Sequence, residues 1–241
     1  MNNARQVTAT KGMLVLLAFA WITGCSGMTL KPPAEKPDFI TPLAAGPSAP
    51  PPQISQKLAI EAALATAREF ERTGFDSEAI AQYLRAREQG STDPEISWRL
   101  AVLHDRQGHL ELARKEYDLA VNASPNNPDL QNDYGYFLYL QHDYTHAKKT
   151  LEQALTLKPG HARAHTNLAM TLVALGESAA ALVHFEKVVS PAEAQYNLGV
   201  LLAQQGRLAE ARRALDAAKQ LNPGFKRPEE LVAQLEASRA R

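Results

Sequence analysis

NLAMTLVALGESAAA, residues 167–181, is the stretch that decides the fold, because it carries a small residue, a turn glycine and an alanine at positions that recur along the chain. The turn position recurs at a step of 34 residues, as Gly74, Gly108, His142 and Gly176. Two alanine positions keep the same step, at Ala79, Ala113, Ala147 and Ala181 and at Ala86, Ala120, Ala154 and Val188. A fifth copy, with Gly206 and Ala211, follows after a step of 30 residues. Self-similarity at this period is typical of stacked helical repeats.

The repeated pattern resembles the tetratricopeptide repeat, a helix-turn-helix unit, and the resemblance covers Ile60 to Gly224. It implies an all-α fold, an α-solenoid of about five repeats. Small residues in the first helices would let the helix axes approach closely, since larger side chains there would overpack by about 1–3 kcal/mol. These small residues are Ala101, Gly135, Ala169 and Gly199. Proline cannot continue a helix, so second helices are expected to end before Pro125, Pro159 and Pro223.

Two departures from the repeat pattern have structural consequences. His142 takes the place of the turn glycine in the third unit, and histidine is among the residues enriched at positive φ. The second helix of the fourth unit runs into VVSPAEAQYNLG, residues 188–199, where Pro191 arrives early and four residues are missing. Four residues turn an α-helix by about 400°, so the stack should continue with a changed local curvature. Residues 226–241, with Pro228 near their start, are expected to form a C-terminal capping helix.

The start of the chain has the layout of a lipoprotein signal peptide. MLVLLAFAWI, residues 13–22, is apolar but shorter than the roughly 20 residues that cross a bilayer, and it follows a segment with Arg5 and Lys11 and no acid. Residues 22–24 precede Cys25, the single cysteine, and resemble the lipobox of bacterial lipoproteins. The resemblance implies cleavage of residues 1–24 as a signal peptide and lipidation of Cys25, including a palmitate-type acyl chain. An ordinary secreted protein or an uncleaved anchor is the alternative.

A proline-rich segment follows the cysteine and separates it from the repeats. Residues 25–53 hold eight prolines, which favour extended polyproline II segments, so we expect a disordered tether. The repeat domain is then expected at 54–225. Ser26, rather than Asp, follows the cysteine, and by the sorting rule of enteric bacteria this implies the periplasmic face of the outer membrane, with the inner membrane as the alternative.

Composition and motifs disfavour several classes of function. Without residues 1–24 the chain has 24 basic and 26 acidic residues, and this balance leaves no basic stripe for a nucleic acid. No nucleophile elbow, phosphate-binding glycine loop or zinc-protease motif is present. His161 and His165 lie four apart, as do His142 and His146, but no cysteine or paired carboxylate completes a metal site. We therefore predict that the chain is not an enzyme and has no metal, cofactor or small-molecule substrate.

In this family the first helices line a concave surface, so the resemblance places the candidate binding residues there. The predicted partner-binding residues are Trp98, Tyr136, Tyr139, Asn167, Met170, Tyr196 and Asn197. Asn132, Thr166 and Val173 are expected on the same surface. The column Asp133, Asn167 and Asn197 resembles part of an asparagine ladder that holds a peptide backbone, although these side chains could equally join one helix to the next.

Lipobox, spacer and repeats together are similar in layout to the lipoproteins that assist pilus or secretin assembly. The leading hypothesis is a membrane-anchored scaffold that binds protein or peptide partners in its concave groove and supports assembly of an envelope complex. The alternative is a structural scaffold that self-associates through the short fourth unit and the C-terminal helix.

Overall fold

The computed structural model describes residues 55–239, and every regular element in that range is an α-helix. The predicted signal peptide, Cys25 and the predicted tether lie outside the described residues. The helices are α1 (Gln56–Thr73), α2 (Asp76–Glu88), α3 (Glu95–Arg106), α4 (Leu110–Ala123), α5 (Pro128–Leu140), α6 (Tyr144–Leu157), α7 (Ala162–Ala174), α8 (Ser178–Phe185), α9 (Pro191–Gln204), α10 (Leu208–Leu221) and α11 (Arg227–Arg239).

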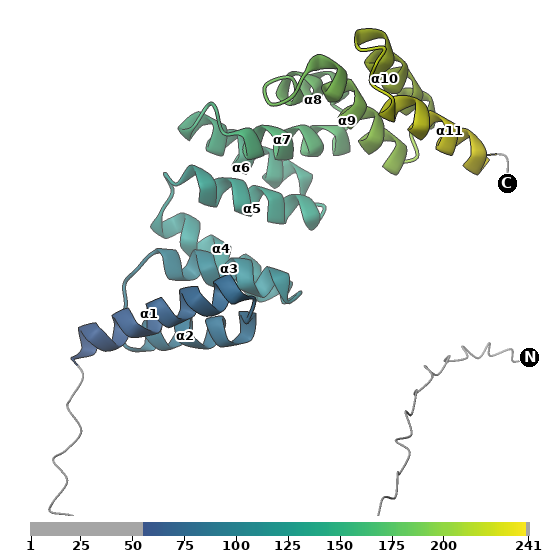
Figure 1. Ribbon diagram of the computed structural model, residues 1–241. Helices are drawn as coiled ribbons and strands as arrows, with labels where there is room; N and C mark the ends of the chain where they lie inside the picture. Colours follow the sequence, from purple (N-terminus) through teal and green to yellow (C-terminus); the bar gives the residue numbers. More distant parts are fainter. Residues whose placement is uncertain (1–54, 240–241) are drawn as a thin grey trace, which may run out of the picture. The chain divides into compact units, whose positions relative to one another are not determined.

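The helices form five consecutive pairs, α1/α2 to α9/α10, followed by the single helix α11 (Figure 1). Each pair packs mainly on itself, and its members also contact the next pair. From α3 onward the first helices touch one another directly, as α3 on α5, α5 on α7 and α7 on α9. We call the side formed by α3, α5, α7 and α9 the first-helix face. The predicted all-helical solenoid of about five repeats with a C-terminal helix is confirmed.

Small residues in the first helices bring the two helices of a pair together. Gly135 and Gly199 are buried, and a Cβ added at either would lie 2.6 Å from Leu151 Cγ or 2.8 Å from Leu215 Cγ. Both contacts are shorter than van der Waals packing allows, so each leucine fills the space that its glycine leaves. The alanines at the two repeating positions of the second helices are also buried, which explains why the register is strict.

The turns inside the pairs use left-handed backbone. Gly74, Gly108, Gly176 and Gly206 all have positive φ, between 74° and 84°. In the third pair His142 takes this conformation with φ of 60°, as the sequence predicts, and its Nδ1 lies 2.6 Å from the Tyr144 hydroxyl.

Ion pairs along the second helices link one pair to the next. The Arg87 guanidinium of α2 binds both carboxylate oxygens of Glu116 in α4, at 2.9 and 2.7 Å. Lys148 of α6 reaches Glu177, the residue before α8, at 2.8 Å. Neighbouring units are thus joined by apolar packing and by charged contacts across the outer helices.

Helix α8 is the shortest helix, with eight residues, and it ends at Phe185. The next helix begins at Pro191, behind a capping box in which Ser190 and Glu193 satisfy each other's backbone groups. Proline fits the first turn of a helix, and the capping box fixes the start of α9. The early end of the fourth second helix that the sequence predicts is therefore confirmed.

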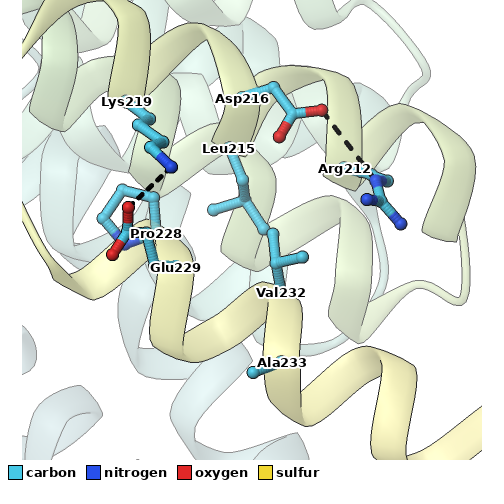
Figure 2. Close-up of a pocket in the computed structure, with 8 residues that line it drawn as sticks. All are labelled: Arg212, Leu215, Asp216, Lys219, Pro228, Glu229, Val232 and Ala233. Atoms are coloured by element: carbon cyan, nitrogen blue, oxygen red, sulfur yellow. Dashed lines mark ion pairs between the residues drawn. The ribbon is translucent and has the colours of Figure 1, made fainter. Parts of the chain in front are cut away.

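Helix α11 packs on α10 and, more lightly, on α9. A cleft of about 300 Å³ lies between α10 and α11, with Leu215 and Val232 at its apolar side (Figure 2). Lys219 binds Glu229 at 2.7 Å across the cleft, and Arg212 lies 3.9 Å from Asp216 (Figure 2). None of the helices in the described range is both long and apolar enough to span a membrane.

Candidate functional site: the first-helix face

Aromatic side chains from the third pair occupy the middle of the first-helix face. Tyr136 is 39% exposed, and its ring stacks on that of Tyr139 with 6.2 Å between centroids. Tyr139 in turn contacts Tyr144 at the start of α6, at 5.7 Å. Burial raises the pKa of the half-buried Tyr139, as do its two tyrosine neighbours, so this hydroxyl stays protonated in the neutral range. The stack holds the exposed ring of Tyr136 in a fixed position.

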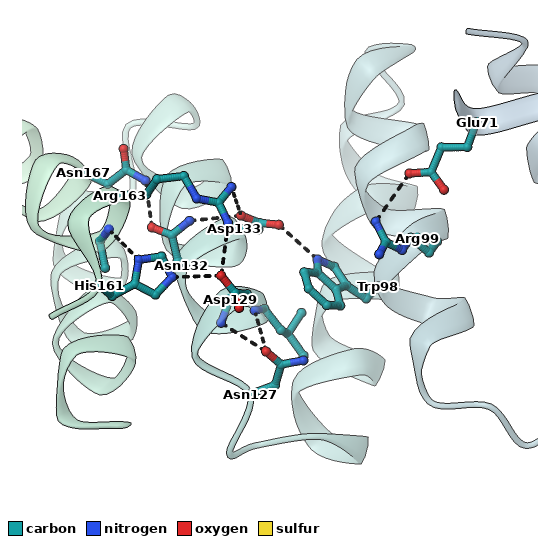
Figure 3. A network of polar contacts seen from close by, with 12 residues as sticks. Glu71, Trp98, Arg99, Asn127, Asp129, Asn132, Asp133, His161, Arg163 and Asn167 are labelled. Carbon is teal, nitrogen blue, oxygen red and sulfur yellow. Dashed lines mark hydrogen bonds and ion pairs between the residues drawn. The ribbon is translucent and has the colours of Figure 1, made fainter. Parts of the chain in front are cut away.

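Trp98 joins two neighbouring first helices. Its indole N–H donates to Asp133 Oδ2 at 3.2 Å, so a residue of α3 is bonded to one of α5 (Figure 3). The guanidinium of Arg99 lies over the ring at 5.0 Å from its centroid. With one edge bonded to α5 and one face covered by a cation, the half-buried Trp98 has less free surface for a partner than Tyr136 has.

The asparagine column forms contacts between helices. Asn167 of α7 donates its amide to Asn132 Oδ1 at 2.9 Å, and Asn132 donates to Asp133 Oδ1 at 3.0 Å (Figure 3). Asn132 is only 2% exposed. The geometry is that of the helix-joining alternative, in which these amides bond to each other. The half-buried Asn197 lies one unit further along the face.

A charged cluster lies where α5 and α7 begin. Asp129 Oδ1 accepts from Arg163 Nη2 at 3.1 Å and faces His161 Nε2 at 3.0 Å (Figure 3). Burial opposes ionisation of Asp129, but hydrogen bonds from Arg163 and His161 outweigh it and lower its pKa. Arg163 also lies 3.7 Å from Asp133. One guanidinium therefore bridges two carboxylates.

His161 is the N-cap of α7 rather than half of a paired metal site with His165. Its Nδ1 accepts the backbone N–H of Ala164 at 3.3 Å, and its ring is 4% exposed. Since Nδ1 accepts, the proton is on Nε2, which donates to Asp129, and the ring is neutral. His165 points elsewhere, with its Nδ1 3.0 Å from Nδ1 of His184 and its Nε2 2.8 Å from the Pro159 carbonyl.

The other predicted binding residues differ in how much they present to solvent. Met170 and Tyr196 are half-buried, and the ring of Tyr196 meets that of Phe225 edge to face at 5.3 Å. Val173 is fully buried in the core of the third to fifth pairs, so the expectation that it lines the face is wrong. Its position on α7 points between α7 and its neighbours because helix packing, rather than register alone, decides which side chains reach solvent.

A depression of about 520 Å³ lies on the first-helix face beside the charged cluster. Its lining residues come from α5, α7 and the segment after α8: Asn132, Asp133, Tyr136, Ala162, Arg163, Thr166, Asn167, Val188 and Val189. Repeat register assigns Val188 to a buried alanine series, but the structure places it in this wall because α8 ends three residues earlier. The missing four residues were the sequence signal that could have revealed this wall.

Family comparison agrees with the repeat geometry. A model of YpiA-like C-terminal tetratricopeptide repeats matches residues 94–161, and two models of the tetratricopeptide repeat match 138–191 and 192–225. The chain is a tetratricopeptide-repeat protein. The structure assigns to each matched region the helix pairs that the family description requires, from α3/α4 to α9/α10.

Curated relatives resemble this repeat protein over part of their length. The type IV pilus assembly protein PilF of Pseudomonas aeruginosa is 30% identical over 116 residues, which are 47% of this chain and 46% of PilF. An uncharacterized protein of Haemophilus influenzae is 38% identical over 56 residues, which are 23% of this chain and 31% of that protein. The repeat protein thus spans less than half of the length of these relatives.

Solved structures share the fold. The structure of Pseudomonas aeruginosa PilF matches with a TM-score of 0.55 and 24% identity, over 78% of this chain and 88% of that one. YrrB, described as a TPR protein with an unusual peptide-binding site, matches with a TM-score of 0.58 and 22% identity, over 74% and 97% of the two chains.

Proposed function

We propose that this repeat protein is a membrane-anchored scaffold that binds protein or peptide partners on its first-helix face. The observation that carries the proposal is the exposed Tyr136, held by stacking on Tyr139 at the edge of the depression. Rigid aromatic side chains beside a concave surface are typical anchors of protein interfaces.

The similarity to PilF supports a more specific role in assembling an envelope complex of pilus or secretin type. The peptide-binding site named for YrrB supports a peptide or protein segment as the ligand. Partner identity is part of the proposal, since the fold alone does not carry function.

The anchoring half of the proposal rests on Cys25 and the lipobox-like residues before it. Several acyl chains together make membrane release very slow, at about 0.8 kcal/mol per buried methylene. We place the protein on the periplasmic face of the outer membrane. Replacing Cys25 by Ser should abolish incorporation of radiolabelled palmitate and remove the protein from the membrane fraction. Palmitate labelling that persists in the Cys25→Ser variant contradicts the anchor.

The binding half can be tested with matched variants on the two sides of the helix pairs. Proteins captured from envelope extract would be purified, and their affinities measured for wild-type protein and for Tyr136→Ala with Met170→Ala. Truncated anchors typically lose more than about 2 kcal/mol, so we expect roughly thirtyfold weaker binding.

The control carries Lys149→Ala and Arg213→Ala, two exposed positions on the outer helices α6 and α10, where little effect is expected. Circular dichroism verifies that both variants keep their helices. Loss of binding in the control with normal binding in the Tyr136 and Met170 variant would overturn the proposal.

Self-association is the second candidate, and one observation favours it. The cleft between α10 and α11 carries two cations and two anions, a self-complementary set, and Val183 on the short α8 is 56% exposed. Static light scattering separates the two candidates, because a monomer at micromolar concentration rules out self-association at that strength.

A further inference from the structure

The depression on the first-helix face owes its apolar wall to the shortened fourth unit. In the second and third pairs the residues equivalent to Val188 are Ala120 and Ala154, which lie within α4 and α6 and are fully buried. In the fourth pair the helix ends at Phe185, and the backbone N–H groups of Val188 and Val189 both donate to the Phe185 carbonyl, at 2.9 and 3.0 Å.

This turn places the two valines, both half-buried, in the wall of the depression. Tyr136 of α5 belongs to the same lining, so an aromatic ring and two branched aliphatic side chains share one hollow. Its volume of about 520 Å³ lies within the range of roughly 300–1,000 Å³ that is usual for ligand-binding clefts. Such a hollow suits an aliphatic side chain of a partner.

The polar side of the depression has an excess of negative charge. Asp129 and Asp133 face one guanidinium, that of Arg163, while His161 is neutral because its Nδ1 accepts a backbone N–H. Glu193, exposed at the start of α9, adds a further carboxylate in the column of Asp129 and Arg163. The Arg163 side chain is 65% exposed and bound only at the surface, so it can move aside for a second cation.

We propose that the depression recognises a partner segment in which an aliphatic side chain lies next to a lysine or arginine. The aliphatic side chain packs among Tyr136, Val188 and Val189, and the cation binds beside Asp129 and Asp133. The inference rests on the proposed function and names the chemistry of the partner. Val188 and Val189 are the specificity-determining residues, and they come from a unit that lacks four residues rather than from the general repeat pattern.

Selection from a phage-displayed library of random peptides tests this preference directly. Wild-type protein should enrich sequences that carry an aliphatic residue adjacent to Lys or Arg. The binding of the most enriched peptide is then measured by fluorescence anisotropy against two variants. Val188→Thr with Val189→Thr keeps the side-chain shape but adds hydroxyls to the wall, and we expect about tenfold weaker binding.

Asp129→Asn keeps an acceptor for Arg163 and His161 but removes the charge. It should weaken binding and also flatten its dependence on salt, a change that a merely structural role would not produce. Val183→Thr on α8 and Glu152→Gln on α6 are the matched controls at exposed outer positions, and both should bind as wild type does.

Enriched peptides without the aliphatic and basic pair, or equal binding by the two valine replacements and their control, would overturn the inference. A failure of selection in a protein whose envelope partners still depend on Tyr136 and Met170 would also overturn it, while leaving the proposed function intact. If those partners ignore the first-helix face altogether, the proposed function itself fails.

Discussion

Gly135 shows how a single residue sets the distance between two helices. Its absent side chain is the space into which Leu151 packs, and the same relation joins Gly199 to Leu215 one and a half units later in the chain. Because neither glycine has a left-handed backbone, the requirement is for small volume and not for conformational freedom.

Replacing Gly135 by Ala should therefore destabilise the protein by about 1–3 kcal/mol, in spite of the better helix propensity of alanine, because Leu151 must move. Gly160→Ala is the control, since a Cβ at Gly160 meets nothing within 4 Å. Urea unfolding followed by circular dichroism measures both. Equal stabilities of the two variants would show that the pair can open without cost.

At this scale the sequence predicts some features and misses others for a physical reason. Ala147 and Gly135 are predictable because repeat spacing fixes which positions lie between helices. The bond from Trp98 to Asp133 and the bond from Asn167 to Asn132 are not, because they depend on side-chain rotamers in two different units. Register assigns Trp98 to the face but cannot tell that its N–H is already bonded.

Helix α8 is the element in which this chain departs most from regular repetition. Its early end moves Val188 and Val189 out of a helix and into the wall of the depression. The missing residues and the early proline predict the break, whereas the direction in which the following segment turns depends on hydrogen bonds to Phe185.

The same short element contains a histidine pair that makes stability depend on pH. Burial lowers the pKa of His184, and the neighbouring His165 and Lys187 lower it further. The unfolded chain, with an ordinary pKa of about 6.5, takes up this proton first as the pH falls. The contribution to stability is therefore complete above about pH 6.5 and is lost as the pH falls toward the lower pKa of the folded state.

His184→Gln should reduce the loss of stability between about pH 7 and pH 5, where one proton can change it by at most about 1.4 kcal/mol per pH unit and solvent screening lowers that limit. His142→Asn is the control, because it removes an exposed histidine and asparagine tolerates the positive φ at that position. Thermal unfolding at a series of pH values gives the comparison. Identical pH profiles for wild type and His184→Gln would contradict the assignment.

For the molecule as a whole, five pairs with one register produce two unlike sides. The second helices are joined to each other by ion pairs such as Arg87 with Glu116, while the first helices touch directly and carry Tyr136, the charged cluster and the depression. Periodicity alone predicts the fold class and the existence of the first-helix face. It cannot predict which of its side chains remain available, because bonds between units consume several of them.

The most direct test of the first-helix face as the binding surface is hydroxyl-radical footprinting of the protein, with and without a purified envelope partner. Oxidation at each side chain is read by mass spectrometry. We predict that the partner protects Tyr136 and Met170, while Leu119 of α4 and Val183 of α8, exposed on the outer helices, are oxidised as in the free protein. Protection of Leu119 and Val183 with unchanged oxidation of Tyr136 and Met170 would contradict the account.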